Sequence, residues 1–286
     1  MESQEQLLDT ILKAVEELPP MPSTVLELRR VIADPDVNYD RLAPIIKKDP
    51  SLCADLLKIS NSAAIGVGHN VDTVDEAIRY FGVSSLVEFV AAACSEQIIQ
   101  QSFASVNHLN EYTQHSRAVS LATAFMSEAF HLDQHDREVF TLTGLLHDIG
   151  RLVILLFTEE KEYCEEVLGL NWQEVHAMVA TEKDIFGIDH AVLGQKICQK
   201  WQFPDRIING VRMHHTPLIG NHIYKDGLIL FLSEIITVES TPDIVLEMAL
   251  PPGVLEKMGI KTSELIDAKH KYIEAAQKLN IAQNAD

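Results

Sequence analysis

Apolar residues recur at intervals of three and four along most of this chain, and this spacing constrains its fold more than any other feature. Residues 5–17 show the pattern with a stripe of Leu7, Leu8, Ile11, Leu12 and Val15. Such a stripe predicts a helix with one buried face. No stretch shows a sustained alternation of apolar and polar residues, which is the pattern of a half-buried strand. We therefore expect an all-α protein with little or no sheet.

Prolines and glycines divide this helical pattern into segments. The first helix should stop at "LPPMP", because proline cannot continue a helix. A second helix is expected over residues 23–33, where Ser23 suits the N-cap, and "DRLAPIIKKDPSLCADLLKISN" supplies two more short ones. The stretch "VDTVDEAIRYFG" then predicts a helix with a glycine stop, and "VSSLVEFVAAACSEQIIQQS" predicts another helix.

The most polar interruption near the middle lies at residues 100–112, and histidines begin to appear within apolar runs beyond it. We place a soft boundary there, between an N-terminal helical lobe over residues 1–105 and a helical bundle with a C-terminal helical tail over residues 106–286. One continuous bundle is the alternative.

The composition limits where this protein works and what it binds. Its 286 residues carry a formal net charge of −19, which works against direct binding to nucleic acid but leaves room for a local pocket for a small phosphate ligand. The four cysteines lie far apart and predict neither disulfides nor a thiolate metal site. The acidic N-terminus is unlike a signal peptide, and we find no apolar run that approaches the length of a membrane span. We expect a soluble, cytoplasmic protein.

The stretch "GLLHDIGRLVI" at residues 144–154 places His147 and Asp148 inside an apolar run. Burying an unpaired carboxylate is costly, so a partner or a metal must compensate it. One interpretation is an internal ion pair with other helices, and the other is a pair of neighbouring ligands for a divalent ion. Gly144 and Gly150 would let another helix or a ligand approach closely.

Further polar side chains lie on apolar helical stripes. His115 shares a face with Val119, Ala122 and Met126. A lone histidine of this kind is usually a satisfied core residue. His190 follows Asp189, a suitable N-cap, and the next predicted helix ends in His214 and His215, where cations would also favour the helix dipole.

Glu234 lies in the apolar run "GLILFLSEIITV", so we expect it to be at least partly buried. Five histidines and two carboxylates therefore face inward from at least five predicted helices. Such an oxygen and nitrogen set is typical of Fe, Mn, Zn or Mg sites, with one or two ions. We assign no role to the histidines in polar surroundings, which are His69, His108, His131, His135, His176, His222 and His270.

The order His115, His147-Asp148, His190, His214-His215, Glu234 resembles the HD superfamily of metal-dependent phosphohydrolases. The stretches "LPPMPSTVLELRRVIADP", "IIKKDPSLCADLLKISNSA", "DEAIRYFGVSSLVEFV" and "GLLHDIGRLV" look more specifically like the HDOD domain, from about Leu18 to about residue 240. The resemblance implies an N-terminal helical lobe packed on an HD-type bundle. It also implies metal ligands at His115, His147, Asp148, His190, His214, His215 and Glu234.

Three positions depart from the pattern of that superfamily. Glu234 stands where an aspartate is usual, Arg151 stands where many relatives have lysine, and "HHTPLIGNHIYKDG" lacks the GYP motif. The hydrolysis of cyclic di-GMP is therefore poorly supported. Arg151 keeps the positive charge of the lysine, and with it the prediction of a phosphate contact beside the reactive centre at Asp148.

Two functions follow from the resemblance. The first is a regulatory module of a bacterial signalling system that retains metal and binds a signalling protein or a small phosphorylated ligand. The second is an enzyme that hydrolyses a phosphoester or nucleotide with water activated by the metal. Oxygenase chemistry at two irons is a further alternative.

Overall fold

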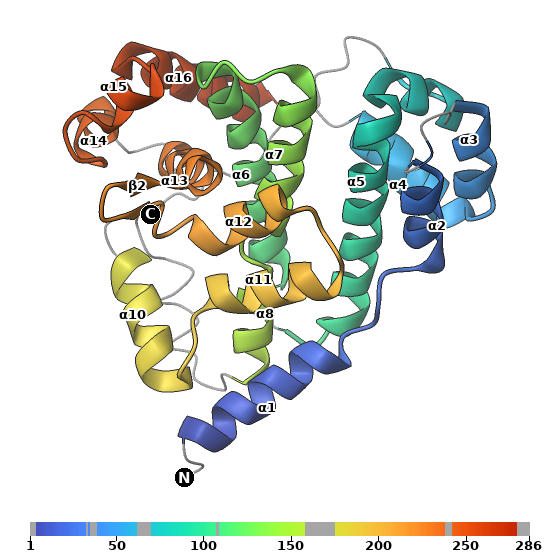
Figure 1. The fold of residues 1–286 in the computed structure, drawn as a ribbon, viewed down its shortest axis with the longest axis horizontal. Coiled ribbons are helices and arrows are strands. Elements are labelled where there is room, and N and C mark those ends of the chain that lie inside the picture. The colour runs from blue at the N-terminus through green and yellow to red at the C-terminus, as the bar shows by residue number, and fades with distance from the viewer. Residues whose placement is uncertain are drawn as a thin grey trace.

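The computed structural model is almost entirely helical (Figure 1), and it describes residues 4–32, 34, 39–61, 70–106, 109–157, 175–237 and 242–278. Within these ranges the strands form one antiparallel hairpin, β1 (Leu218–Ile219) and β2 (His222–Ile223). The prediction of an all-α protein is confirmed.

The N-terminal helices gather around α5. The chain breaks at "LPPMP" as predicted, and the backbone of Gly82 (φ 73°, ψ 171°) is non-helical, which confirms the glycine stop. Helices α2, α3 and α4 all pack against α5. The bounds are α1 (Gln4–Glu17), α2 (Ser23–Ile32), α3 (Tyr39–Lys47), α4 (Pro50–Ser60) and α5 (Val74–Ser102).

The second group of helices is built around α6, which packs against α7, α13 and α16. Beside it, α11 packs against α8 and α12. The bounds are α6 (Leu109–Ala129), α7 (Gln134–Leu146), α8 (Ile149–Leu156), α10 (Val175–Phe186), α11 (His190–Lys200), α12 (Asp205–Met213), α13 (Lys225–Thr237), α14 (Asp243–Met248), α15 (Val254–Met258) and α16 (Thr262–Lys278).

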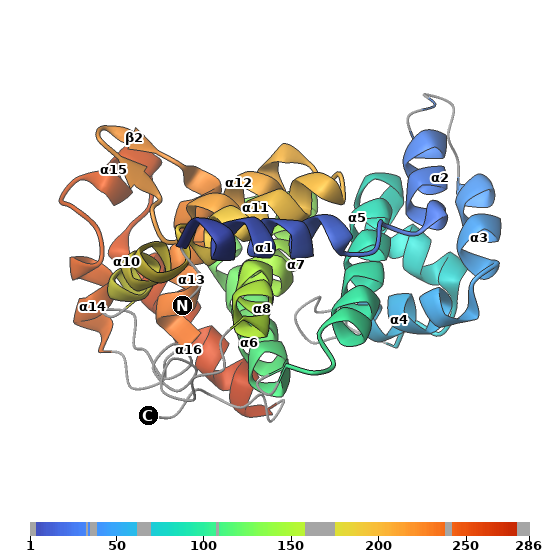
Figure 2. The same cartoon turned by 90° about the horizontal axis from the view of Figure 1, so that it is seen from below.

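Helix α1 extends from the α5 group across the second group, where it packs against α8, α10 and α11 (Figure 2). The indole of Trp201, at the end of α11, donates a hydrogen bond of 3.0 Å to the carbonyl of Pro19. A single apolar cluster accordingly runs from Ile11 on α1 to Val211 on α12. The division of the chain near residue 105 stays a prediction.

The stretch "GLLHDIGRLVI" is not one continuous helix. Helix α7 ends at Leu146 and α8 begins at Ile149, with His147 and Asp148 between them. The backbone of Asp148 has φ −100° and ψ 13°, in the bridge region between helical and extended conformations. The break lets both side chains reach the same buried space, whereas on a continuous helix they would diverge by about 100°.

The glycines beside this break allow backbones to touch, as expected. A Cβ at Gly144 on α7 would lie 2.7 Å from the Cα of Ser120 on α6. A Cβ at Gly150 on α8 would lie 2.7 Å from the backbone nitrogen of Gly194 and would also overlap the carbonyl of His190, both on α11. Helices α7 and α8 therefore press directly on the two helices that supply His115 and His190.

The segment Gln134–Leu156, which contains α7 and α8, is long and apolar enough to cross a membrane by length and composition. This corrects our statement that no apolar run approaches that length. Of the most apolar 18-residue stretch of this segment, 89% is buried inside the described part of the molecule. Such burial is what the core helix of a globular protein shows.

We predict that Gly150→Ala destabilises the protein by about 3 kcal/mol, near the upper end of overpacking costs, since the new methyl group would meet backbone atoms that cannot rotate away. Gly253→Ala is the comparison: its φ is 84°, and beyond its chain neighbours no atom of the described residues lies within 4 Å of the added Cβ, so only left-handed strain of about 1 kcal/mol is expected. Urea unfolding of both variants measures the difference. An equal loss in the two would contradict the close approach of α8 to α11.

Candidate metal centre

All seven side chains predicted as metal ligands meet in one place, and each comes from an element whose packing explains its position. The α7–α8 break supplies His147 and Asp148, and α11 begins with His190 because Asp189 caps the helix by accepting a 2.7 Å hydrogen bond from the backbone of Val192. The others lie on α6, after α12 and on α13, and they are His115, His214, His215 and Glu234.

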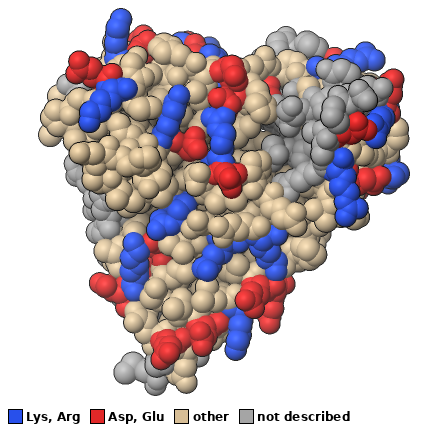
Figure 3. Space-filling model, in the orientation of Figure 1, with Lys and Arg blue, Asp and Glu red and all other residues tan. Residues whose placement is uncertain are grey.

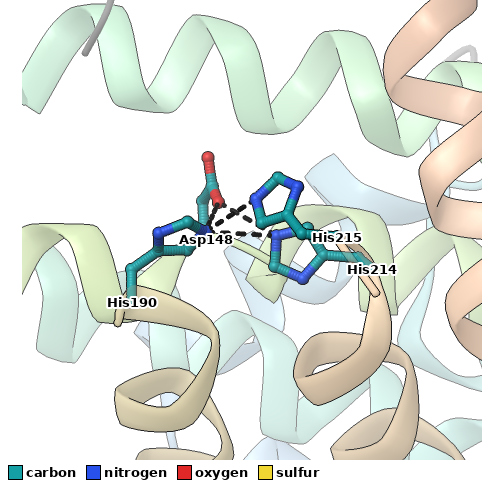
Figure 4. A group of neighbouring side chains, drawn as sticks. All are labelled: Asp148, His190, His214 and His215. Atoms are coloured by element: carbon teal, nitrogen blue, oxygen red, sulfur yellow. Dashed lines mark hydrogen bonds and ion pairs between the residues drawn. The ribbon is translucent and has the colours of Figure 1, made fainter. Parts of the chain in front are cut away.

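The seven residues form two groups that share Asp148. Group A consists of Asp148, His190, His214 and His215 (Figure 4), and group B consists of His115, His147, Asp148 and Glu234. In each group one possible ligand atom from every residue lies within 4.8 Å of the others.

The two carboxylate oxygens of Asp148 are divided between the groups. Its Oδ1 lies 3.4 Å from Nε2 of His190 and 3.4 Å from Nε2 of His214, both in group A. Its Oδ2 lies 3.5 Å from Nε2 of His115 and 3.4 Å from Nε2 of His147, both in group B. Asp148 therefore belongs to both groups.

Helix ends orient two of the imidazoles. Nδ1 of His147 lies 2.8 Å from the carbonyl of Gly144, and Nδ1 of His214 lies 2.6 Å from the carbonyl of Val211. In both cases the carbonyl belongs to the last turn of the helix, where backbone acceptors lack a helical partner. The ring donates from Nδ1 to that carbonyl, so Nε2 points into the cluster.

His190 is oriented by a carboxylate that the sequence analysis missed. Oε2 of Glu182 on α10 lies 2.6 Å from Nδ1 of His190 and accepts a 2.9 Å hydrogen bond from its backbone nitrogen. Glu182 is fully buried. A carboxylate behind a ligating histidine fixes its tautomer and raises its basicity. In the sequence, Glu182 lies eight residues before His190. Its neighbours in "ATEKD" are polar, so the sequence pattern there is that of a solvent-exposed helix face.

The orientation of these rings concentrates lone pairs in group A. When Nδ1 carries the proton of a neutral imidazole, Nε2 carries a lone pair. Nε2 of His190 and Nε2 of His214 lie 3.4 Å apart, and both face Oδ1 of Asp148. Oδ1 is buried and makes no hydrogen bond within the described part of the chain. Nε2 of His215 lies 2.8 Å from Nε2 of His190 and can donate a hydrogen bond to it. A cation between Oδ1 of Asp148 and Nε2 of His214 would satisfy the acceptors that remain.

The carboxylates set the charge of group B. Burial opposes the charged form of His147, but Asp148 and Glu234 outweigh it and raise the pKa of His147 to about 10. Burial also opposes ionisation of Asp148, yet Arg151 and His147 hold the pKa of this carboxyl well below its ordinary value. A proton on His147 thus stands where a metal ion would bind.

Three other histidines of the cluster are kept neutral. Burial and the neighbouring His147 lower the pKa of His115 to about 4. Burial lowers the pKa of His214, and burial together with His214 and His190 holds the pKa of His215 well below its ordinary value. Neutral imidazole is the form that binds metal.

Arg151 lies inside the cluster rather than at its edge. Its Nη1 lies 2.8 Å from Oδ2 of Asp148, and its Nη2 lies 3.3 Å from Sδ of Met178. Only 10% of its side chain is exposed. The predicted contact of Arg151 with phosphate stays a prediction.

The histidines to which we assigned no role lie elsewhere or are not described. His131, His135, His222 and His270 are exposed, and none belongs to either group. His69 and His108 lie outside the described residues, as does the side chain of His176.

The donor set fits a divalent metal ion. It combines imidazole nitrogens with carboxylate oxygens, a buried Oδ1 of Asp148 without a hydrogen bond and rings oriented by outer partners. The structure therefore contains a buried His/Asp/Glu cluster that could bind metal at one or two positions.

An all-helical fold with a buried His-Asp pair at a helix break, surrounded by histidines from neighbouring helices, is that of an HD-type protein. The chain belongs to the HDOD domain family, whose model matches residues 18–217. This confirms the resemblance drawn from the sequence.

Three bacterial proteins are among those similar to this chain. An uncharacterised protein of Treponema pallidum (strain Nichols) is 27% identical over 241 residues, which are 79% of this chain but only 45% of that protein. A proposed phosphohydrolase from Shewanella amazonensis SB2B has a TM-score of 0.68 at 21% identity, covering 94% of this chain and 97% of that one. A proposed signal transduction protein from Marinobacter aquaeolei VT8 has a TM-score of 0.64 at 16% identity, covering 98% of this chain and 65% of that one. At these identities the two structures show a shared fold.

We predict that the metal-free protein is most stable near neutral pH. The raised pKa of His147 contributes stability that is complete below about pH 6.5 and is lost as the pH rises to about 10. The lowered pKa of His115 acts oppositely, since its contribution is complete above about pH 6.5 and is lost as the pH falls to about 4. Urea unfolding in chelator between pH 5 and pH 9.5 tests this, and His147→Gln should flatten the alkaline limb whereas the exposed His222→Gln should not. Stability that still rises from pH 7 to pH 9.5 would refute the assignment to His147.

We predict that Glu182→Gln weakens metal binding by about 10- to 100-fold without unfolding the protein, because His190 loses the charged partner that fixes its ring. Competition titration with Zn²⁺ or Mn²⁺ against a chromophoric chelator measures the affinity. Glu96→Gln, which removes a surface carboxylate paired with Arg117, is the matched control. Equal affinities of the two variants would show that Glu182 does not support the site.

Proposed function

We propose that this HDOD protein is a bacterial signalling module that retains a divalent-metal centre. The observation that supports the metal most directly is the facing set of acceptors in group A, in which Nε2 of His190 and Nε2 of His214 converge on Oδ1 of Asp148. A protein without a cation at this position would gain stability by replacing one of them.

The donors favour some metals over others. Magnesium is usually bound by oxygen ligands and retains waters, manganese also prefers oxygen ligands, and imidazole suits Fe and Zn. Five of the seven donor residues are histidines. We therefore place Fe or Zn ahead of Mn and Mg in this site. A bound metal of this kind lowers the pKa of water and polarises phosphoryl oxygens.

The signalling role rests on the family and on the absence of one motif in the sequence. HDOD membership is shown by the family model, and the double histidine is followed by the β1–β2 hairpin in place of a GYP motif. The name of the similar Marinobacter aquaeolei protein also proposes signal transduction. In this role, the partner is a signalling protein or a small phosphorylated ligand whose binding depends on whether the cluster holds metal.

Nucleic acid is not among the partners we propose. Acidic and basic side chains are interspersed over the face shown in Figure 3, and the whole chain has a formal net charge of −19. A net negative charge of this size repels a phosphate backbone. We place the protein in the cytoplasm, where cysteines such as Cys94 and Cys198 stay as thiols.

The second candidate function is a metal-dependent phosphohydrolase. It is favoured by the presence of all seven donors in two groups and by the guanidinium of Arg151 beside Asp148, which could meet a phosphate once the cluster opens. The name of the Shewanella amazonensis SB2B protein proposes this activity for a protein of the same fold. Its substrate would be a phosphoester or a nucleotide.

We predict that protein purified without added metal contains close to one equivalent or more of a transition metal, and that Asp148→Ala removes most of it because Asp148 serves both groups. Elemental analysis of the dialysed protein measures the content. His222→Ala, at an exposed histidine, is the control and should keep the metal. A metal content below about a tenth of an equivalent in wild type, with no change in Asp148→Ala, would overturn the metal centre.

The same protein, loaded with metal and offered a panel of nucleotides and phosphodiesters, separates the two functions. Turnover that disappears in Asp148→Ala would support the enzyme. Absence of turnover on every substrate, with metal bound, would support the module.

A further inference from the structure

A small pocket lies where α5 of the N-terminal group meets α6 and α7 of the second group. Helix α5 packs against α7 (Figure 1), and Glu96 on α5 pairs with Arg117 on α6 at 3.1 Å. The pocket has a volume of about 40 Å³, which is room for about three water molecules. We call it the seam pocket, and its inner lining includes Ala92, Ile99, Tyr112, Ser116, Leu145 and Leu146.

Two hydroxyl groups that line the seam pocket are buried and lack partners. Tyr112 and Ser116 are 4% and 3% exposed, and they lie one turn apart on α6. Neither side-chain oxygen makes a hydrogen bond within the described part of the chain. Burial raises the pKa of Tyr112, so its phenol keeps the proton and can donate. Unsatisfied buried hydroxyls are costly, so a group that both donates and accepts belongs beside them.

The walls of the seam pocket are aliphatic. Ala92 and Ile99 come from α5, and Leu145 and Leu146 come from the end of α7. A buried water needs two to four polar partners, and two hydroxyls do not supply these for about three waters. Aliphatic walls with a few convergent polar groups are the usual lining of a site for a small molecule.

The charges at the seam pocket offset each other. Among the described residues that line it, the charged ones are Glu96 and Arg117, whose side chains are 38% and 51% exposed. They lie at the solvent end of the pocket and pair with each other. An ion that entered would leave water without meeting a charge to compensate it. The pocket therefore suits a neutral group.

The seam pocket adjoins the elements that carry two donors of group B. Ser116 follows His115 on α6, and Leu146 directly precedes His147 at the α7–α8 break. A molecule in the pocket would therefore touch α5 of the N-terminal group together with both of these elements.

We propose that the seam pocket binds a small neutral molecule through an amide or hydroxyl group. The hydroxyls of Tyr112 and Ser116 hold that group, and the aliphatic part of the molecule lies against the walls. The site is separate from the metal centre and takes a different class of ligand from the phosphorylated one named above. Its role as an input to the signalling module rests on the proposed function, whereas the binding itself does not.

Acetamide is the probe, because it is small enough for the pocket and its amide both donates and accepts. Acetate has nearly the same shape but carries a negative charge. Each is titrated into isotopically labelled protein and followed by nuclear magnetic resonance. Acetamide should shift backbone amides of α5, α6 and α7 saturably, with a dissociation constant of about 1 to 10 mM, since so small a molecule makes few contacts. Acetate should bind at least about tenfold more weakly.

Tyr112→Phe and Ser116→Ala each remove one hydroxyl and should weaken the binding of acetamide about fivefold, the value of one hydrogen bond. Ser127→Ala is the matched control and should leave the affinity unchanged. Ser127 lies on the same helix, and its buried hydroxyl also lacks a partner among the described residues, but it does not line the seam pocket. Thermal unfolding by circular dichroism establishes that each variant is folded, and either hydroxyl variant suffices if the other is not.

Three outcomes would overturn the proposal. Absence of a saturable shift with acetamide up to about 100 mM would show that the seam pocket holds water only. Equal affinity for acetate would overturn the neutral class of ligand. Equal weakening in Ser127→Ala and Ser116→Ala would overturn the assignment to the two hydroxyls.

Elemental analysis of the same samples separates this inference from the proposed metal centre. Saturable binding of acetamide by protein that holds no metal would support the seam pocket and overturn only the metal centre. Bound metal without binding of acetamide would overturn only the seam pocket.

Discussion

The structure of this protein depends on one buried charge, the carboxylate of Asp148. Its side chain has no exposed surface, and its two oxygens face imidazoles that come from α6, the α7–α8 break, α11 and the end of α12. Each of these elements must stop, begin or approach its neighbour at a fixed place for the charge to be compensated. The helix break, the tight packing at Gly144 and Gly150, and the buried pair of Glu182 and His190 all serve that requirement.

Much of the fold could be predicted from the sequence because its signals are local. The three- and four-residue spacing, the prolines at residues 19–22 and the N-cap at Asp189 each act within a few residues, and the structure agrees with them. The inward direction of His115 and Glu234 could also be predicted, since their helical neighbours are apolar.

The remaining features depend on contacts between distant segments. Apolar residues continue on both sides of His147-Asp148, so the periodicity gave no sign that the helix stops there, and the break follows from bringing both side chains to one buried space. Glu182 looks like an ordinary surface glutamate until α10 is packed behind His190. The contact of Arg151 with Asp148 could be anticipated from their i, i+3 spacing, but the choice of Oδ2 over Oδ1 could not.

The hydrogen bonds from His147 and His214 to the carbonyls of Gly144 and Val211 have a consequence for how a ligand would be received. Both rings take their direction from the ends of their own helices, so their orientation is settled when the chain folds. Metal binding normally restricts the rotation of the ligating rings, and here folding has already restricted it. A site prepared in this way can capture and exchange ions with little rearrangement of its helices, and the ion it carries will follow intrinsic affinity and cellular supply more than any adjustment of the protein.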